Sequence, residues 1–116
     1  MLKFVDHIDM LVKDLESEVA FLEKLGFIIK RRLPDHGNAV EMQLPGENQV
    51  VFEMRACGEK APGIRHIAFR VEDLHTVEEL KGNGVVFRTE NRFVEATGRT
   101  VSNVNDPNGN SWQLTD

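Results

Sequence analysis

Two ten-residue stretches decide the fold of this chain: DHIDMLVKDL, residues Asp6–Leu15, and RHIAFRVEDL, residues Arg65–Leu74. When His7 is aligned on His66, four further identities fall in register: Ile8 with Ile67, Val12 with Val71, Asp14 with Asp73 and Leu15 with Leu74. Near the ends of the two copies, FEM of residues 52–54 matches WQL of residues 112–114. An internal repeat of this kind indicates two copies of one structural module.

Each copy opens with an alternating strand, residues 4–12 or 64–71, followed by a helical pattern in residues 13–27 or 72–85. In the first helix the apolar residues recur at helical spacing, Asp14 is placed to cap its start and Gly26 to end it. Further apolar stretches bounded by turn residues predict three more strands per copy: residues 27–33, 38–44 and 49–56, then 84–89, 98–105 and 110–116.

The predicted fold class is therefore α+β, with two tandem βαβββ modules. Module 1 covers about residues 1–57 and module 2 about residues 63–116, joined by the Gly/Pro-bearing linker CGEKAPG. The sequence DPNG, residues 106–109, predicts a turn into the last strand. At 116 residues the chain has the length of one ordinary domain.

Composition excludes several classes of function. The net charge of −5 and the lack of a Lys/Arg cluster argue against a nucleic-acid partner. No apolar run is long enough to span a membrane, and charges interrupt any signal-like core at the start of the chain. The single cysteine, Cys57, excludes an internal disulfide and suits a reducing compartment, so we expect a cytoplasmic protein.

Strand alternation predicts which side chains share a face. Apolar residues of the first and last strand of each module are assigned to packing against the helices. The opposite faces then carry His7, Glu53, His66 and Gln113, one residue on each of these four strands. Two imidazoles, a carboxylate and an amide are nitrogen and oxygen donors that suit a divalent transition metal.

The stretches HIDMLVKDLESEVAFLEKLGF, VVFEMRA, RHIAFRVEDL and DPNGNSWQL resemble the vicinal oxygen chelate superfamily, which includes glyoxalase I, methylmalonyl-CoA epimerase, extradiol dioxygenases and bleomycin resistance proteins. The resemblance covers essentially the whole chain. It implies a glyoxalase-like fold, in which the paired modules form a cupped mixed sheet around the site. It also implies a divalent metal ion (Ni, Zn, Co or Mn) held by His7, Glu53, His66 and Gln113. Gln113 departs from the glutamate that is usual at this position.

The same resemblance implies a metal-dependent, glyoxalase-like lyase or isomerase. Glu53 is the predicted catalytic base, which removes a proton next to a carbonyl while the metal stabilises the enediolate. One alternative is an epimerase like methylmalonyl-CoA epimerase, which ordinarily needs a second base, a role open to Asp9. Another is a metal-free binding protein of the bleomycin-resistance type. A dioxygenase fits worse, because the chain has no tyrosine and carries Gln113 where such enzymes have a carboxylate.

Three further residues, Asp9, Arg55 and Arg70, share the predicted site face. The arginines could hold a carboxylate or phosphate of a small-molecule substrate, or the charged groups could simply pair with one another. The polar, glycine-bearing stretch of residues 88–99 predicts a surface loop in which Phe93 could cover a ligand. His36 and His75 are expected to be solvated. We also expect a homodimer.

Overall fold

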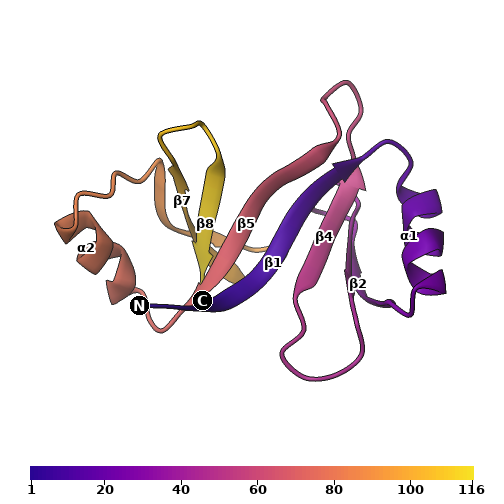
Figure 1. Ribbon diagram of the computed structural model, residues 1–116, viewed down its shortest axis with the longest axis horizontal. Helices are drawn as coiled ribbons and strands as arrows, with labels where there is room; N and C mark the ends of the chain where they lie inside the picture. Colours follow the sequence, from indigo (N-terminus) through magenta and orange to yellow (C-terminus); the bar gives the residue numbers. More distant parts are fainter. The chain divides into compact units, whose positions relative to one another are not determined.

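The computed structural model describes residues 1–116, with eight strands and two helices that follow the order β-α-β-β-β twice (Figure 1). The predicted fold class is confirmed. The elements are β1 (Leu2–Val12), α1 (Leu15–Lys24), β2 (Ile28–Leu33), β3 (Ala39–Gln43), β4 (Val51–Ala56), β5 (Gly63–Val71), α2 (His75–Gly82), β6 (Thr89–Val94), β7 (Arg99–Asn105) and β8 (Ser111–Thr115). Neither helix is both long and apolar enough to cross a membrane.

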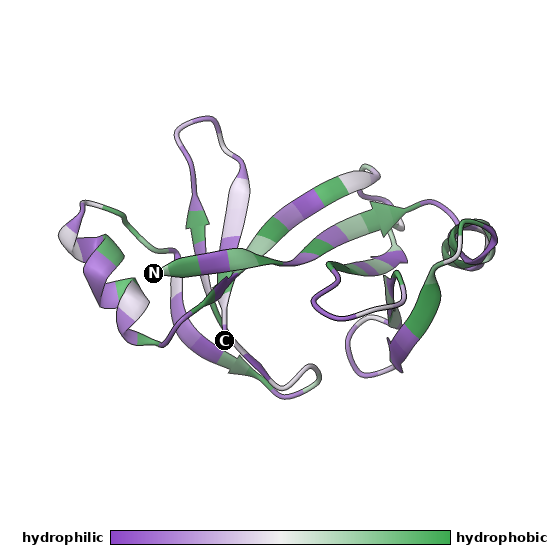
Figure 2. Ribbon diagram, turned by 60° about the horizontal axis from the view of Figure 1, so that its bottom comes forward, coloured by the Kyte–Doolittle hydropathy of each residue, from purple (hydrophilic) through white to green (hydrophobic).

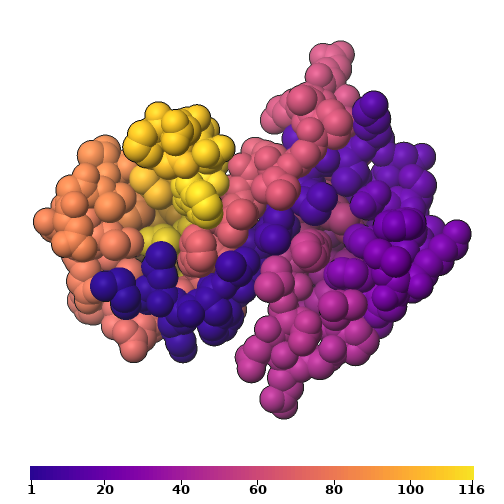
Figure 3. All heavy atoms as spheres, in the orientation of Figure 1, coloured from indigo at the N-terminus to yellow at the C-terminus, as the bar shows by residue number.

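The chain forms two compact units whose limits differ from those of the predicted modules. One unit is His7–Arg65, and the other combines Met1–Asp6 with His66–Asp116. The first six residues join the second module because the backbone N–H of Glu72 donates to the carbonyl of Met1 at 3.2 Å. The terminal ammonium of Met1 also donates to Thr76 Oγ1 at 3.0 Å. Figure 3 shows this indigo N-terminal end among the later residues of its unit.

In the unit of residues 7–65 the strand order is β2-β3-β4-β1, with β1 parallel to β4 and the other pairs antiparallel. Helix α1 begins where Asp14 caps it by accepting a hydrogen bond from the backbone of Ser17, and it is followed by Gly26 at φ +101°. Its buried residue Val19 packs with three residues of the sheet, Val40, Met42 and Met54.

In the unit that contains residues 66–116 the order is β5-β8-β7-β6, with β5 parallel to β8. Val77 of α2 packs on Val71 and Leu114 to form the core. Phe69 stacks on Trp112 with ring centroids 5.9 Å apart. The hydropathy colouring of Figure 2 shows hydrophobic and hydrophilic residues mixed along the strands, as expected for sheets with one face packed under a helix.

Register confirms the predicted division of faces. Met10, Phe52 and Met54 pack into the core of their unit, and Phe69 and Leu114 pack into the core of the other. Since neighbouring residues of a strand point to opposite sides, the remaining faces carry His7 and Asp9 on β1, Glu53 on β4, His66 on β5 and Gln113 on β8. The faces that the helices leave uncovered therefore hold the four predicted metal ligands and Asp9.

One strand was predicted in the wrong place. The prediction put a strand at residues 84–89 and a loop at residues 88–99, whereas β6 is Thr89–Val94 and pairs antiparallel with β7. β6 is the outermost strand of its unit, so polar side chains there can remain in solvent while the backbone pairs. An irregularity in register between Thr89 and Arg92 includes Asn91, whose φ is +46° and whose backbone N–H donates to Ser102 Oγ at 2.8 Å.

Candidate functional site

A row of charged side chains crosses the uncovered face of the sheet in residues 7–65. Register pairs Arg31 of β2 with Glu41 of β3, Glu41 with Glu53 of β4, and Glu53 with Asp9 of β1. We call these four residues the charged row. Its three carboxylates are almost entirely buried, with residue exposures of 0% for Asp9, 0% for Glu41 and 3% for Glu53. Buried charges require compensation, and their concentration at one level marks this face as a candidate active site.

The equivalent positions of the other unit carry no charge. There Thr89 of β6 pairs with Asn103 of β7, Asn103 with Gln113 of β8, and Gln113 with Ala68 of β5. Gln113 Nε2 donates to Asn103 Oδ1 at 3.0 Å, which leaves the Gln113 carbonyl oxygen as the group free to accept or to bind a cation. The two modules share a backbone pattern, and only the first carries ionisable groups at these positions.

Arg31 compensates the charge of Glu41. Its Nε donates to Glu41 Oε1 at 2.6 Å, and its Nη2 donates to Oε2 at 3.3 Å. The pKa of Arg31 is raised, chiefly by this hydrogen bonding to Glu41. Arg31 and Glu41 therefore form a close ion pair at one end of the charged row. Neither residue was singled out from the sequence, although a lone glutamate between Val40 and Met42 in an apolar strand was a usable signal.

Arg55 lies between the other two carboxylates. Its Nη2 is 3.4 Å from Asp9 Oδ2 and 3.7 Å from Glu53 Oε2, and Nη1 of Arg65 lies 3.8 Å from the same oxygen of Asp9. The alternative in which the charged groups pair with one another is thus observed for Arg55 and Asp9. The side chain of Arg65 is about two-fifths exposed, so it extends from the buried acid to solvent.

The pKa of Asp9 is raised above its ordinary value of 3.8. Burial is the main cause, because it penalises the charged carboxylate, and the nearby charge of Glu53 adds to it. Arg55, Arg65 and His7 act in the opposite direction without cancelling the shift. Asp9 consequently keeps its proton to higher pH than a solvated aspartate does.

The loop between β2 and β3 brings a histidine to this site. His36 was expected to be solvated, but its Nε2 lies 3.8 Å from Glu53 Oε1 and its side chain is only 26% exposed. The adjacent Gly37 has φ +63°, and a Cβ there would lie 3.4 Å from Cδ and Nη1 of Arg55. The sequence PDHGN predicts only a turn, because no local feature of these residues indicates that His36 packs against β4.

The remaining predicted substrate-binding residues, Arg70 and Phe93, belong to the other unit. Arg70 donates from Nε and Nη2 to Asp6 Oδ1, at 3.1 and 2.7 Å, and Arg99 Nε lies 3.4 Å from Asp6 Oδ2. Asp6 and Arg99, neither of which was predicted, are both buried.

Phe93 is 62% exposed and is the register partner of Thr100, so it lies on the sheet face opposite Gln113. His75 is exposed on α2, as expected.

The four predicted metal ligands fall into two pairs. His7 and Glu53 are 2% and 3% exposed in the unit of residues 7–65, and His66 and Gln113 belong to the other unit. Within the first pair, His7 is the register partner of Val51, two positions from Glu53. No group of three or more His, Cys, Asp or Glu side chains is arranged to hold a metal ion. Metal binding by these residues stays a prediction.

Comparison with known proteins identifies relatives of the fold. A family model described as Glyoxalase/Bleomycin resistance protein/Dioxygenase superfamily matches residues 4–114. Methylmalonyl-CoA epimerase of Streptomyces coelicolor, in complex with 2-nitronate-propionyl-CoA, superposes with a TM-score of 0.81 at 17% identity, over 99% of this chain and 97% of that one. The epimerase of Mycobacterium tuberculosis gives 0.74 at 21% identity, over 98% and 87%. A hypothetical protein of Bacillus halodurans gives 0.71 at 20%, over 96% and 91%. No curated protein matches the chain.

Proposed function

Because the chain belongs to the Glyoxalase/Bleomycin resistance protein/Dioxygenase superfamily, we propose that it is an isomerase that moves a proton at a carbon next to a carbonyl, with an acyl-coenzyme A ester as substrate. The likeness of its fold to epimerases solved with such esters supports this choice. The lyase of the glyoxalase type, which the sequence favoured, gains no specific support from these comparisons. The epimerase alternative is the better supported of the two.

The observation that carries the proposal is the pair of buried carboxylates Asp9 and Glu53 on neighbouring strands. Isomerisation at such a carbon needs one group that accepts a proton and one that supplies a proton. Two adjacent carboxylates do not both ionise as readily as one, so the pair can hold a base and an acid at the same pH. Glu53 is proposed as the base and Asp9 as the second proton carrier.

The proposed reaction balances within these residues. Glu53 takes the proton when the carbon–hydrogen bond breaks, and the electron pair moves onto the carbonyl oxygen as an enolate. Protonated Asp9 then supplies a proton to the same carbon and the carbonyl re-forms. Transfer of the first proton from Glu53 to Asp9 restores the starting state. Arg55, which contacts both carboxylates, keeps them in place and limits their mutual repulsion.

His7, Glu53, His66 and Gln113 are the residues proposed to hold a divalent metal ion. Donor chemistry supports them, and in particular the amide of Gln113 is oriented by Asn103 so that its carbonyl oxygen is the free end. Such an ion would stabilise negative charge on the enolate oxygen. Arg70 remains a proposed contact for an anionic part of the substrate, because its side chain is 42% exposed beside Asp6.

Hydrogen exchange tests the proposal directly. The protein is incubated with methylmalonyl-CoA in deuterated water, and incorporation of deuterium next to the thioester is followed by NMR together with the ratio of the two epimers. Incorporation with interconversion is expected. Formation of a lactoyl thioester from methylglyoxal hemithioacetal would instead favour the lyase. If folded, metal-supplemented protein exchanges no proton on either compound, the isomerase proposal is wrong.

A further inference from the structure

One nitrogen of the candidate site, Nε of Arg55, is buried and has no hydrogen-bond acceptor within the chain. The side chain of Arg55 is 21% exposed, so most of it lies inside the protein. Buried polar groups are almost always hydrogen-bonded, and a guanidinium N–H that is removed from water without an acceptor destabilises the fold. An exception of this kind, beside the buried carboxylates of Asp9 and Glu53, requires an explanation.

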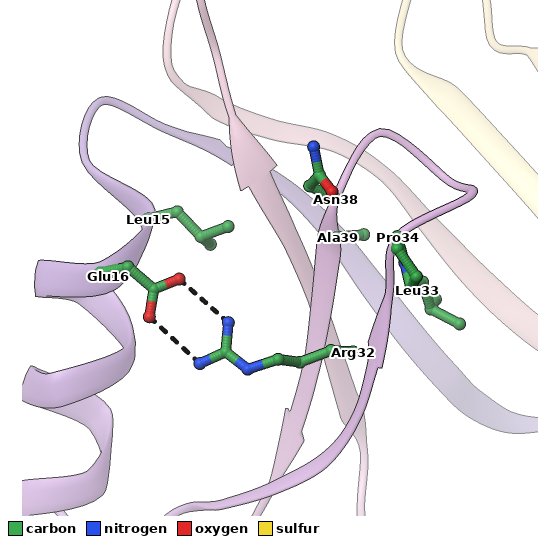
Figure 4. Close-up of a pocket in the computed structure, with 7 residues that line it drawn as sticks. All are labelled: Leu15, Glu16, Arg32, Leu33, Pro34, Asn38 and Ala39. Carbon is green, nitrogen blue, oxygen red and sulfur yellow. Dashed lines mark hydrogen bonds and ion pairs between the residues drawn. The ribbon is translucent and has the colours of Figure 1, made fainter.

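Two other arginines show how a guanidinium of this protein meets a carboxylate. Arg31 donates to Glu41 from Nε at 2.6 Å and from Nη2 at 3.3 Å. Arg32 donates to the two oxygens of Glu16 from Nη1 and Nη2, at 3.0 and 3.1 Å (Figure 4). Each pair engages two nitrogens of the guanidinium, as in the bidentate arrangement that arginine and carboxylate usually adopt.

Arg55 differs because its Nη2 alone serves two carboxylates. Nη2 donates to Asp9 Oδ2 at 3.4 Å and lies 3.7 Å from Glu53 Oε2, and both distances are long for a charge-assisted contact. The Nε–H group takes no part in either interaction. Since Nε and Nη2 are bonded to the same carbon, an oxygen that accepts from Nε lies in the immediate surroundings of both carboxylates.

The loop between β2 and β3 fixes the position of this donor. Gly37 has φ +63°, and a Cβ there would lie 3.4 Å from Cδ and Nη1 of Arg55. The loop therefore packs against the guanidinium near Nη1, while Asp9 and Glu53 hold Nη2. A donor that is held in place before the substrate arrives does not have to reorient as charge develops, and such donors are effective in catalysis.

We propose that the Nε–H group of Arg55 donates a hydrogen bond to the carbonyl oxygen of the substrate and stabilises the enolate that forms there. This inference rests on the proposed isomerase function, in which Glu53 and Asp9 act on the carbon next to that carbonyl. The bond strengthens as the electron pair moves onto the oxygen, because hydrogen bonds to an ionised acceptor are stronger than those to a neutral one. No proton leaves Arg55. Its catalytic role is additional to keeping the two carboxylates in place.

The first test is kinetic and uses deuterium exchange on methylmalonyl-CoA. Arg55→Lys keeps a positive charge between the carboxylates but has no Nε–H group, so its kcat is expected to fall about 10²–10³-fold with little change in KM. If Arg55 only holds the carboxylates in place, the lysine variant retains most of the activity. Arg32→Lys, at an exposed position on the helix-covered side of the sheet, is the matched control and should exchange at the original rate.

The second test observes the Nε–H resonance of Arg55 by NMR in isotope-labelled, zinc-supplemented protein. Saturation with 2-nitronate-propionyl-CoA, an anionic analogue of the enolate, is expected to shift this resonance and to slow its exchange with water. Coenzyme A alone lacks the carbonyl and should leave the resonance unchanged. This measurement uses the original protein, so it decides the question even if Arg55→Lys does not fold.

The outcomes separate this inference from the isomerase proposal. If the original protein exchanges methylmalonyl-CoA and folded Arg55→Lys does so at the same rate, Arg55 is not the donor and the isomerase proposal stands. The same conclusion follows if the analogue shifts the backbone amides of β1 and β4 but leaves the Arg55 Nε–H resonance unchanged. If the original protein neither exchanges the substrate nor binds the analogue, the isomerase proposal is wrong and this inference fails with it.

Discussion

Asp9 and Glu53 are register partners on the parallel strands β1 and β4, and both carboxylates are buried from solvent. Like charges directly opposite one another destabilise a sheet, and burial adds a desolvation penalty to each. Arg55 offsets part of this penalty by lying within 4 Å of both groups. The buried pair of like charges lowers the stability of the sheet locally. A locally destabilising arrangement of this kind indicates a role in function.

Replacing Asp9 by Asn is expected to change stability with a defined dependence on pH. The folded-state pKa of Asp9 is raised above 3.8, so its favourable contribution is complete below that pH and is lost as pH rises through the folded-state pKa. Asp9→Asn should therefore gain stability relative to the original protein at neutral pH, and the gain should vanish in acid. Urea unfolding at several pH values measures this. Asp35→Asn, in an exposed loop, should show no such trend.

Neighbouring arginines on β2 should differ in their effect on stability. Arg31→Gln removes an ion pair made by the buried carboxylate of Glu41, at an expected cost of about 1–3 kcal/mol. Arg32→Gln breaks an exposed, solvent-screened pair with Glu16 and should change stability much less than Arg31→Gln does. Adding Glu41→Gln to Arg31→Gln should recover part of the loss, because the buried charge that lost this arginine is then removed as well. Equal effects of the two single variants in urea unfolding would contradict this account of Glu41.

Local patterns were enough to predict most of the fold. Periodic apolar residues and the Asp14 cap predicted a helix at residues 13–27, and α1 is Leu15–Lys24. β6 escaped prediction because an edge strand is held by backbone pairing and shows little apolar alternation. Its register with β7 and the irregularity at Asn91 depend on both strands together, so neither strand's sequence alone predicts them.

The candidate site was predictable only in part, for a related reason. Alternation placed Asp9, Glu53 and Arg55 on one face, and the structure bears this out. Glu41 and Arg31 join the row through antiparallel pairing of β2, β3 and β4, whose register depends on the intervening loops. His36 reaches Glu53 from such a loop. Contacts fixed by register and by loop packing have no signature in a single stretch of sequence.

The last hairpin should lose stability when Asp106 is changed to Asn. Its carboxylate accepts hydrogen bonds from Trp112 Nε1 at 3.0 Å and from Asn110 Nδ2 at 2.9 Å, as well as from two backbone N–H groups. These bonds lower its pKa to about 2, so its contribution is present above 3.8 and is lost as pH falls through about 2. Asp106→Asn should thus be less stable at pH 7, with the difference shrinking in strong acid. Fluorescence of Trp112, the only tryptophan, reports the unfolding.

Metal binding is expected to depend on both histidines of the repeat. Untagged protein should contain about one equivalent of nickel, zinc, cobalt or manganese by elemental analysis, and His7→Ala or His66→Ala should lose it. His75→Ala, on the exposed face of α2, is the control and should retain the metal. Gln113→Glu should hold the ion more tightly against a chelator, because it adds a negative charge to the set. If the protein binds none of these ions after incubation with each of them, this prediction is wrong.

Proton exchange on methylmalonyl-CoA should depend on both carboxylates of the Asp9–Glu53 pair. Glu53→Gln removes the proposed base without changing the size of the side chain, and a loss of about 10²–10⁴-fold in the exchange rate is expected. Asp9→Asn should slow interconversion of the epimers more than the first deuterium exchange, because it removes the second proton carrier. Glu59→Gln, an exposed carboxylate beyond β4, is the matched control and should leave both rates unchanged. Exchange by folded Glu53→Gln at the rate of the original protein would show that another group removes the proton.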